Sequence, residues 1–291
     1  MSCQGAGRIW LIGGTRESGE LARALLQAQI PCTVTVTTEA ARSLYPHAAG
    51  LHVWVDRLDL QSLPNFLQTQ QVTAVLDASH PFAVEISELA IAVANKFQLP
   101  YLRYERPEIA PAELRPDELL LNSRELSFEN LDALFTSNIL IGQRTLLTIG
   151  YRFLHRFYPW QQQATLFARI LPSTTALEAA LAAGFTSDRL IALRPPVSAE
   201  MERALWQQWQ ISMVVTKASG KPGGEDVKRQ IAAELGVNLA LINRPPVFYP
   251  QQTSNLKAAV EFCQHHSSRT VVRACSSKAK PQQPTENSSP L

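Results

Sequence analysis

The strongest constraint on the fold is an alternation of short β-rich runs with longer amphipathic segments along most of the 291-residue chain. The runs are too short for helices, and the segments between them repeat apolar residues at helical spacing. This alternation predicts parallel strands joined by right-handed helical crossovers. We therefore expect an α/β protein with two Rossmann-like domains, each with a mainly parallel sheet flanked by helices.

The predicted strands fall into two groups of five. In the first half they are residues 8–12, 32–37, 52–55, 72–76 and 101–103. In the second half they are residues 146–149, 165–170, 190–193, 213–216 and 238–242. The clearest predicted helices are residues 16–29, 81–97, 176–183, 226–235 and 254–263.

A proline-rich, charged segment between residues 106 and 120 interrupts this pattern. It contains Pro107, Pro111 and Pro116, after which the alternation restarts. We therefore predict an NAD(P)-binding domain over 1–110 and a second α/β domain over 111–266 that contributes to the substrate cleft. Residues 267–291 are rich in Ser, Lys, Gln and Pro, which predicts a disordered tail.

The composition is that of a soluble globular protein, with 45% hydrophobic and 18% charged residues. The formal net charge of +2 is too small to indicate nucleic-acid binding. No apolar run approaches the roughly 18 residues of a membrane span, and the run at 9–12 is too short for a signal peptide. We expect a cytoplasmic protein. The four cysteines are far apart, which favours free thiols over a zinc site or a disulfide framework.

A glycine loop follows the first predicted strand. Gly13, Gly14 and Thr15 lead into a helix, where glycines let the backbone close on a pyrophosphate at the helix N-terminus. The loop departs from G-x-G-x-x-G because its first two glycines are adjacent, so a tight turn without a ligand stays open. We predict that these three residues bind a dinucleotide cofactor.

The end of the second predicted strand bears on the choice of cofactor. An acid there would hold the ribose hydroxyls of NAD, whereas hydroxyls and a nearby arginine suit the phosphate of NADP. Thr37, Thr38 and Arg42 favour NADP, and Glu39 argues weakly for NAD. We expect NADPH, with NADH as the alternative, and these residues could also simply cap a short helix.

The fourth predicted strand ends abruptly in polar residues. Asp77, Ser79 and His80 follow its apolar run, and Pro81 suits the first turn of a helix. Ser79 is the predicted cap of that helix and a cofactor contact. We predict that His80 donates a proton and that Asp77 orients it. The structural alternative is a helix cap and a hydrogen-bonded histidine without a catalytic role.

A second strand end, at residues 215–226, is rich in glycine and lysine. Lys217, Ser219 and Gly220 lie where backbone N–H groups and a lysine could bind a carboxylate or phosphate. A loop of solvated lysines is the alternative.

Several arginines are placed near the same predicted cleft. Arg144 and Arg152 flank one strand, Arg169 lies in another, and Arg106 lies at the domain join. Arginine suits the bidentate capture of carboxylates. We predict that these four residues bind the substrate together with the lysine loop.

These motifs, in this order, resemble the precorrin-6A reductase family of cobalamin biosynthesis over about residues 8–263. The motifs are IGGT at 12–15, DASHPFA at 77–83, RYERP at 103–107, LTIG at 147–150, ARILP at 168–172, TKASG at 216–220 and NRP at 243–245. The chain departs from the family pattern at Ser79, where the family usually has threonine, and in its tail after Ser267.

The resemblance implies an NAD(P)H-dependent oxidoreductase that acts on a CH–CH group. It would reduce one double bond of precorrin-6A or cobalt-precorrin-6A to give precorrin-6B on the route to vitamin B12. Its partner would be an acidic tetrapyrrole, with no nucleic acid, membrane or metal, and the protein would be a monomer or homo-oligomer. A non-catalytic NADP sensor and a tetrapyrrole-pathway methyltransferase stay open. A short-chain dehydrogenase is disfavoured because the chain has no Tyr-x-x-x-Lys.

Overall fold

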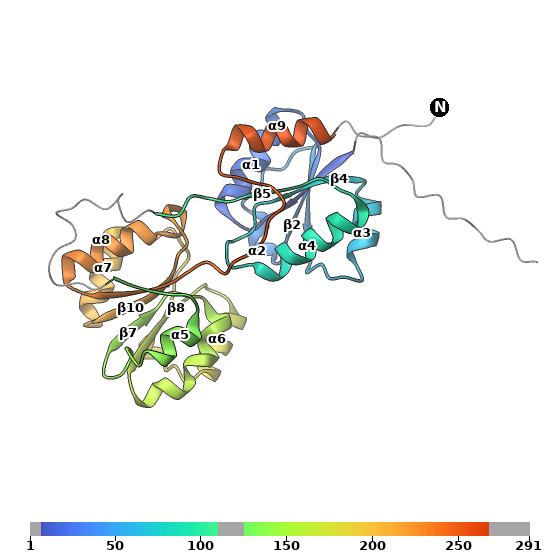
Figure 1. Cartoon of the computed structure of the whole chain (residues 1–291). Coiled ribbons are helices and arrows are strands. Elements are labelled where there is room, and N and C mark those ends of the chain that lie inside the picture. The colour runs from blue at the N-terminus through green and yellow to red at the C-terminus, as the bar shows by residue number, and fades with distance from the viewer. Residues whose placement is uncertain (1–6, 110–124, 268–291) are drawn as a thin grey trace, which may run out of the picture.

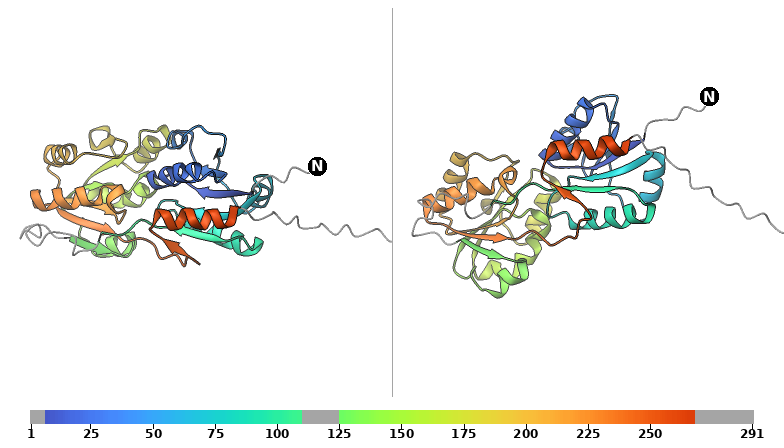
Figure 2. Two further views of the ribbon diagram at one scale, coloured as in Figure 1. Left: turned by 90° about the horizontal axis from the view of Figure 1, so that it is seen from above. Right: turned by 45° about the horizontal axis from the view of Figure 1, so that its top comes forward.

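The computed structural model describes residues 7–109 and 125–267, which form two lobes (Figures 1 and 2). Each lobe contains a six-stranded parallel sheet with helices on both faces, which confirms the predicted α/β class with two Rossmann-like domains. Within the described residues no helix is long and apolar enough to cross a membrane. In the same part of the chain, no group of three or more His, Cys, Asp and Glu side chains could hold a metal ion.

The first sheet has the strand order β12-β5-β4-β1-β2-β3. Its strands are β1 (Arg8–Ile12), β2 (Cys32–Val36), β3 (Leu51–Val55), β4 (Val72–Asp77), β5 (Tyr101–Tyr104) and β12 (Gln252–Thr253). The order reverses between β1 and β4. In open parallel sheets this reversal opens a crevice at the carboxyl ends of the strands, where ligands bind.

Helices cover both faces of the first sheet. They are α1 (Arg16–Gln27) and α9 (Leu256–Ser267) on one face, α3 (Leu63–Thr69) and α4 (Val84–Phe97) on the other, and the single turn α2 (Glu39–Arg42) after β2. Along β1, Ile9 and Leu11 pack on the α1 side, whereas Trp10 and Ile12 pack on the α3 side. Burial on both faces explains why this strand is a continuous apolar run.

The second sheet repeats the arrangement with the order β6-β11-β10-β7-β8-β9. Its strands are β6 (Glu125–Phe128), β7 (Arg144–Leu147), β8 (Thr165–Ile170), β9 (Leu190–Ala192), β10 (Met213–Lys217) and β11 (Asn238–Ile242). Its helical segments are α5 (Leu131–Thr136), η2 (Tyr151–Gln162), α6 (Thr174–Ala182), η3 (Ser187–Arg189), α7 (Ala199–Gln208), η4 (Lys221–Gly223) and α8 (Glu225–Leu235). The order reverses between β7 and β10, so β10 holds the place in this sheet that β4 holds in the first.

The chain crosses twice between the lobes, and each sheet takes its last edge strand from the other half of the sequence (Figure 1). β6 joins the second sheet, whereas β12 returns to pair with β5 in the first. α9 then packs beside α1 and against β4, burying Ala259 and Cys263 (Figure 2).

This return differs from the predicted domain boundaries, which placed residues 111–266 in the second domain. Residues 252–267 lie on the first lobe instead. β12 is a two-residue strand and leaves no periodic signal in the sequence. The predicted boundary between residues 110 and 111 lies outside the described residues, as does the predicted tail of 267–291 beyond its first residue.

Candidate active site at the domain seam

The corner after β4 is closed by a fully buried carboxylate. Asp77, the last residue of β4, accepts hydrogen bonds from the Ser79 amide (2.9 Å), Ser87 Oγ (2.6 Å), Tyr101 Oη (2.7 Å) and Arg103 Nη1 (2.8 Å). Both carboxylate oxygens therefore have two donors each, which is close to their full capacity. Asp77 anchors the end of β4 to β5 and α4.

The predicted pairing of Asp77 with His80 is wrong, because none of these donors is His80. Instead, His80 Nδ1 accepts the amide proton of Phe82 (3.2 Å), so its own proton lies on Nε2. Burial, together with the positive charges of Arg106 and Lys217, lowers the His80 pKa to about 3. The imidazole is therefore neutral near pH 7, and the structure does not favour it as the predicted proton donor.

Pro81 does not open a helix as predicted. The amide of Ala83 donates to the His80 carbonyl (2.7 Å), which closes a β-turn with Pro81 in its second position. Proline suits that position as well as it suits a helix start, because both need the same φ. Ser79 is likewise not the helix cap, since its hydroxyl accepts a bond from Arg103 Nη1 (2.9 Å).

A chain of ion pairs leads from this corner to the second lobe. Arg103 Nε donates to Glu105 Oε2 (2.7 Å), and Arg244 Nη1 donates to Glu105 Oε1 (2.8 Å). Arg244 also donates to the carbonyls of Ala218 (2.9 Å) and Arg106 (2.8 Å). Glu105 and Arg244 were not predicted as site residues, although both lie within motifs that the resemblance uses.

The lobes also meet through Lys217, at the end of β10. Its Nζ lies 4.8 Å from the ring centre of Phe82, in the first lobe, and 4.7 Å from that of Phe153, in the second. Burial and, to a smaller extent, the charge of Arg152 lower the Lys217 pKa to about 8. We call the residues that join the lobes here the domain seam: His80, Phe82, Glu105, Phe153, Lys217, Gly220 and Arg244.

The loop that follows Lys217 is braced from within its own lobe. Gly220, at φ 71°, donates its amide proton to the buried Glu225 Oε2 (2.7 Å). A side chain at this position would bring its Cβ within 2.9 Å of the Pro107 carbonyl oxygen, so glycine permits the close approach of the lobes. Ser219, also predicted as a site residue, is buried beneath the same loop.

The predicted phosphate loop lies where expected, between β1 and α1, but its amides already have acceptors. Gly13 donates to Thr35 O (2.9 Å), Gly14 to Tyr45 Oη (2.7 Å) and Thr15 to Ser18 Oγ (3.1 Å). The amides of Arg16 and Glu17, in the first turn of α1, have no acceptor within the helix. A phosphate at this loop would therefore meet those two amides.

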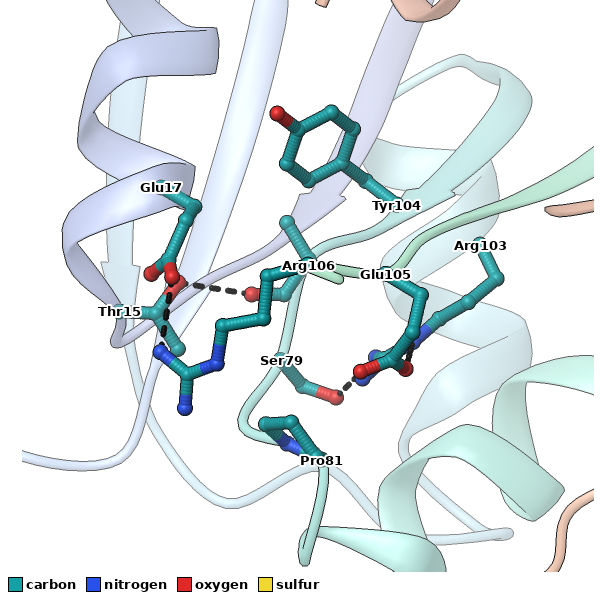
Figure 3. Close-up of a pocket in the computed structure, with 9 residues that line it drawn as sticks. Thr15, Glu17, Ser79, Pro81, Arg103, Tyr104, Glu105 and Arg106 are labelled. Atoms are coloured by element: carbon teal, nitrogen blue, oxygen red, sulfur yellow. Dashed lines mark hydrogen bonds and ion pairs between the residues drawn. The ribbon is translucent and has the colours of Figure 1, made fainter. Parts of the chain in front are cut away.

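A small hollow opens beside the start of α1 (Figure 3). There Arg106 Nη1 pairs with Glu17 Oε1 (2.7 Å). Arg106 Nε and Nη2 and Glu17 Oε2 are buried and have no hydrogen-bond partner among the described residues. The hollow holds about 10 Å³, enough for about one water molecule. It therefore suits one polar group of a ligand whose bulk lies outside.

The residues predicted to choose the cofactor lie beyond the end of β2. Thr37 and Thr38 are exposed, and Arg42 Nε pairs with Glu39 Oε2 (2.9 Å) on the same helical turn. The hydrogen bond from Arg42 lowers the Glu39 pKa. Acid and arginine therefore neutralise each other here, in a place open to solvent.

Arg144 does not reach the seam. It is the first residue of β7, its Nε donates to the Trp209 carbonyl (2.9 Å), and its guanidinium lies 5.1 Å from the Phe167 ring centre. The seam lies at the carboxyl ends of the strands, whereas Arg144 lies at the amino end. This position does not support the prediction that Arg144 contacts the substrate.

The other two arginines predicted to bind the substrate differ in whether their charge is already paired. Arg169 pairs with the buried carboxylate of Glu202, so its charge is already balanced. Arg152 is exposed, and its charge acts on Lys217. Of the two, Arg152 is the one placed to meet a ligand at the seam.

Comparison with known proteins identifies the relatives of this chain. Residues 8–264 match the family described as Precorrin-6x reductase CbiJ/CobK. A cobalt-precorrin-6A reductase of Synechocystis sp. is 47% identical over 261 residues, or 89% of this chain and 96% of the relative. That of Priestia megaterium is 32% identical over 254 residues, or 87% and 96%. A solved CobK precorrin-6A reductase shares the fold, with a TM-score of 0.71 at 21% identity over 91% of this chain and 98% of the other.

Proposed function

Because the chain belongs to the Precorrin-6x reductase CbiJ/CobK family, an oxidoreductase family of cobalamin biosynthesis, we propose that it reduces cobalt-precorrin-6A with NADPH at the domain seam. The family acts on a CH–CH group. The names of the Synechocystis and Priestia relatives favour the cobalt-containing ring, and metal-free precorrin-6A is the alternative.

The hollow beside α1 fits a nicotinamide dinucleotide. Arg106 offers two unpaired N–H groups to a phosphate, and Glu17 offers an acceptor to a ribose hydroxyl. The first-turn amides of α1 would add donors and the positive end of a helix dipole. Gly13, Gly14 and Thr15 would shape the loop rather than donate, and Ser79 would line the hollow. The cofactor, when bound, supplies a hydride.

The residues beyond β2 support NADPH over NADH. An adenosine ribose reaches the end of the second strand in folds with this strand order. There Arg42 could exchange its pair with Glu39 for a pair with the 2′-phosphate, and Thr37 and Thr38 could add hydroxyl donors. NADH would leave the Arg42 to Glu39 pair intact.

The seam would hold the acidic ring. Lys217 and Arg152 supply positive charge there. Ser219 and Gly220 are buried, so they would shape the loop rather than contact the ring. His80 would contribute a neutral Nε2–H donor beside them. Arg169 is already paired with the buried Glu202, so it takes no carboxylate of the ring in this proposal.

One observation carries the proposal: the carboxyl ends of both sheets meet where Lys217 contacts Phe82. Hydride acceptor and donor would thus be held together by groups from two rigid lobes, which removes much of the entropic barrier.

The proposed reductase activity can be tested in an anaerobic assay with cobalt-precorrin-6A and precorrin-6A, each offered NADPH and NADH. We expect NADPH oxidation with the cobalt ring to be fastest. NADPH binding without turnover of either ring would favour a sensor. Tight binding of S-adenosylmethionine instead would favour a methyltransferase.

A further inference from the structure

Lys217 is the one charged group of the seam that is held by ring faces from both lobes. Its Nζ lies between Phe82 and Phe153, at 4.8 and 4.7 Å from their ring centres. Among the described residues, no carboxylate lies within ion-pair distance of it. Aromatic faces attract a cation without accepting its proton. The ammonium is therefore held in place by the rings, and among the described residues it has no hydrogen-bond acceptor that would compete with a ligand.

The groups that face Lys217 are Arg152 from η2 and His80 from the turn after β4. Beyond His80 lie the guanidinium groups of Arg103, Arg106 and Arg244. Arginine does not release its proton in proteins, so only Lys217 and His80 of this set can exchange one.

These two groups differ in what they can donate near pH 7. His80 is neutral there, because burial and the surrounding cations lower its pKa to about 3. Lys217 keeps its proton, and burial lowers its pKa to about 8. A donor whose pKa lies close to the working pH is both protonated and ready to release its proton.

We propose that Lys217 delivers the proton that completes reduction of the macrocycle double bond, while neutral His80 only shapes the site. The inference rests on the proposed reductase function. One atom of the double bond gains a hydride, with its electron pair, and the neighbouring atom must gain a proton. Lys217 breaks one N–H bond as the new bond to the ring forms, and becomes a neutral amine. The amine then regains a proton from water.

The decisive variant is Lys217→Arg, which keeps the positive charge but cannot give up a proton. We expect wild-type kcat to fall above about pH 8. The arginine variant should lose about 10²–10⁴-fold in kcat and lose this pH dependence, while it retains affinity for the ring. Lys217→Met should lose both turnover and ring affinity. His80→Gln should retain the fall above about pH 8.

The matched control is Lys257→Arg, an exposed lysine on α9, which should match wild type throughout. Circular dichroism and NADPH fluorescence would check that each variant folds and binds the cofactor. A readout independent of turnover is ¹³C NMR of the reductively methylated lysines, with the Lys217 signal assigned by its absence in Lys217→Arg. That signal should titrate near pH 8 rather than 10.5.

The outcomes separate the two claims. The assignment of Lys217 as the proton donor would be overturned, with the proposed function unaffected, by either of two results. One is a near-wild-type kcat in Lys217→Arg, and the other is a pH dependence that disappears in His80→Gln but persists in Lys217→Arg. A Lys217 signal that titrates at 10.5 would do the same. Wild-type protein that reduces neither ring would overturn the proposed function, and the donor assignment with it.

Discussion

The turns after β4 and after β10 occupy matching places in two sheets of the same strand order, yet their chemistry is opposite. After β4, Asp77 is saturated by four donors, and the nearby His80 is neutral. After β10, Lys217 has two aromatic rings around it and no carboxylate among the described residues. We call these the β4 corner (residues 77–83) and the β10 corner (residues 217–224).

The difference shows how one topology supplies both a scaffold and a reactive group. Asp77 ties three elements of the first lobe together, which makes the β4 corner rigid. Lys217 carries a charge that no ion pair balances among the described residues, so a ligand can balance it. Because the corners face each other, the rigid one positions the ring of Phe82 against the lysine of the other.

Removal of the Asp77 charge should break the β4 corner. Asp77→Asn removes one of the two carboxylates that pair with the fully buried Arg103 and leaves only Glu105, and loss of one partner of a buried pair costs up to about 3–5 kcal/mol. Urea unfolding would measure the loss. The same change at an exposed acid, Glu261→Gln, should cost less than about 0.5 kcal/mol. Equal losses in the two variants would show that the β4 corner is not the scaffold.

Acid should weaken the β4 corner through His80. The folded-state pKa of about 3 lies below the ordinary value of 6.5, so the unfolded chain binds the proton more readily between these values. Stability is therefore fully present above pH 6.5 and falls below it, by up to about 1.4 kcal/mol per pH unit. Unfolding at pH 7 and pH 5 would show the loss in wild type and a smaller one in His80→Gln. A pH dependence unchanged by this substitution would contradict the neutral histidine.

Arg106 tests whether the cofactor belongs on the β4 side of the seam. Arg106→Met removes two charge-assisted donors from the hollow, so the Kd for NADPH should rise by about 10–100-fold with little change for the ring. Fluorescence titration measures the Kd for NADPH without turnover. Arg144→Met is the matched control and should change neither affinity, because Arg144 lies at the amino end of β7. A loss of ring affinity instead would assign Arg106 to the substrate.

The smallest expected effect lies away from both corners. Arg42→Ala should weaken NADPH by about tenfold, the value of one charge-assisted contact, and leave NADH unchanged. The ratio of the two Kd values is the measurement, and Glu39→Gln should move it in the opposite direction because it frees Arg42. A ratio that neither substitution alters would mean that the 2′-phosphate binds elsewhere.

The sequence predicted most of the central strands to within one or two residues. Central parallel strands are buried on both faces, so their continuous apolar runs can be recognised from the sequence alone, as in β1 and β8. The edge strands β6 and β12 were missed. β6 alternates exposed and half-buried residues, and β12 has only two residues, so neither leaves a continuous apolar run.

For the site, the sequence identified His80, Arg106 and Lys217 but not what each contacts. It also missed Glu17, Phe82, Phe153 and Glu105, whose roles depend on partners far along the chain. Glu105 and Arg244 are 139 residues apart and meet only across the seam. No local pattern encodes such a contact.

The sequence by itself determined the α/β class, the two sheets, the family and the polar strand ends where we propose that ligands bind. These follow from periodicity and residue type, which act over a few neighbouring residues. The tertiary structure alone decided that Asp77 binds Arg103 rather than His80, that Arg144 lies at the amino end of β7, away from the seam, and that Lys217 meets Phe82. The partners, the burial and the pKa of a side chain depend on segments that only folding brings together. Here those segments leave the positive charge of Lys217, in the β10 corner, as the charge that a ligand can balance.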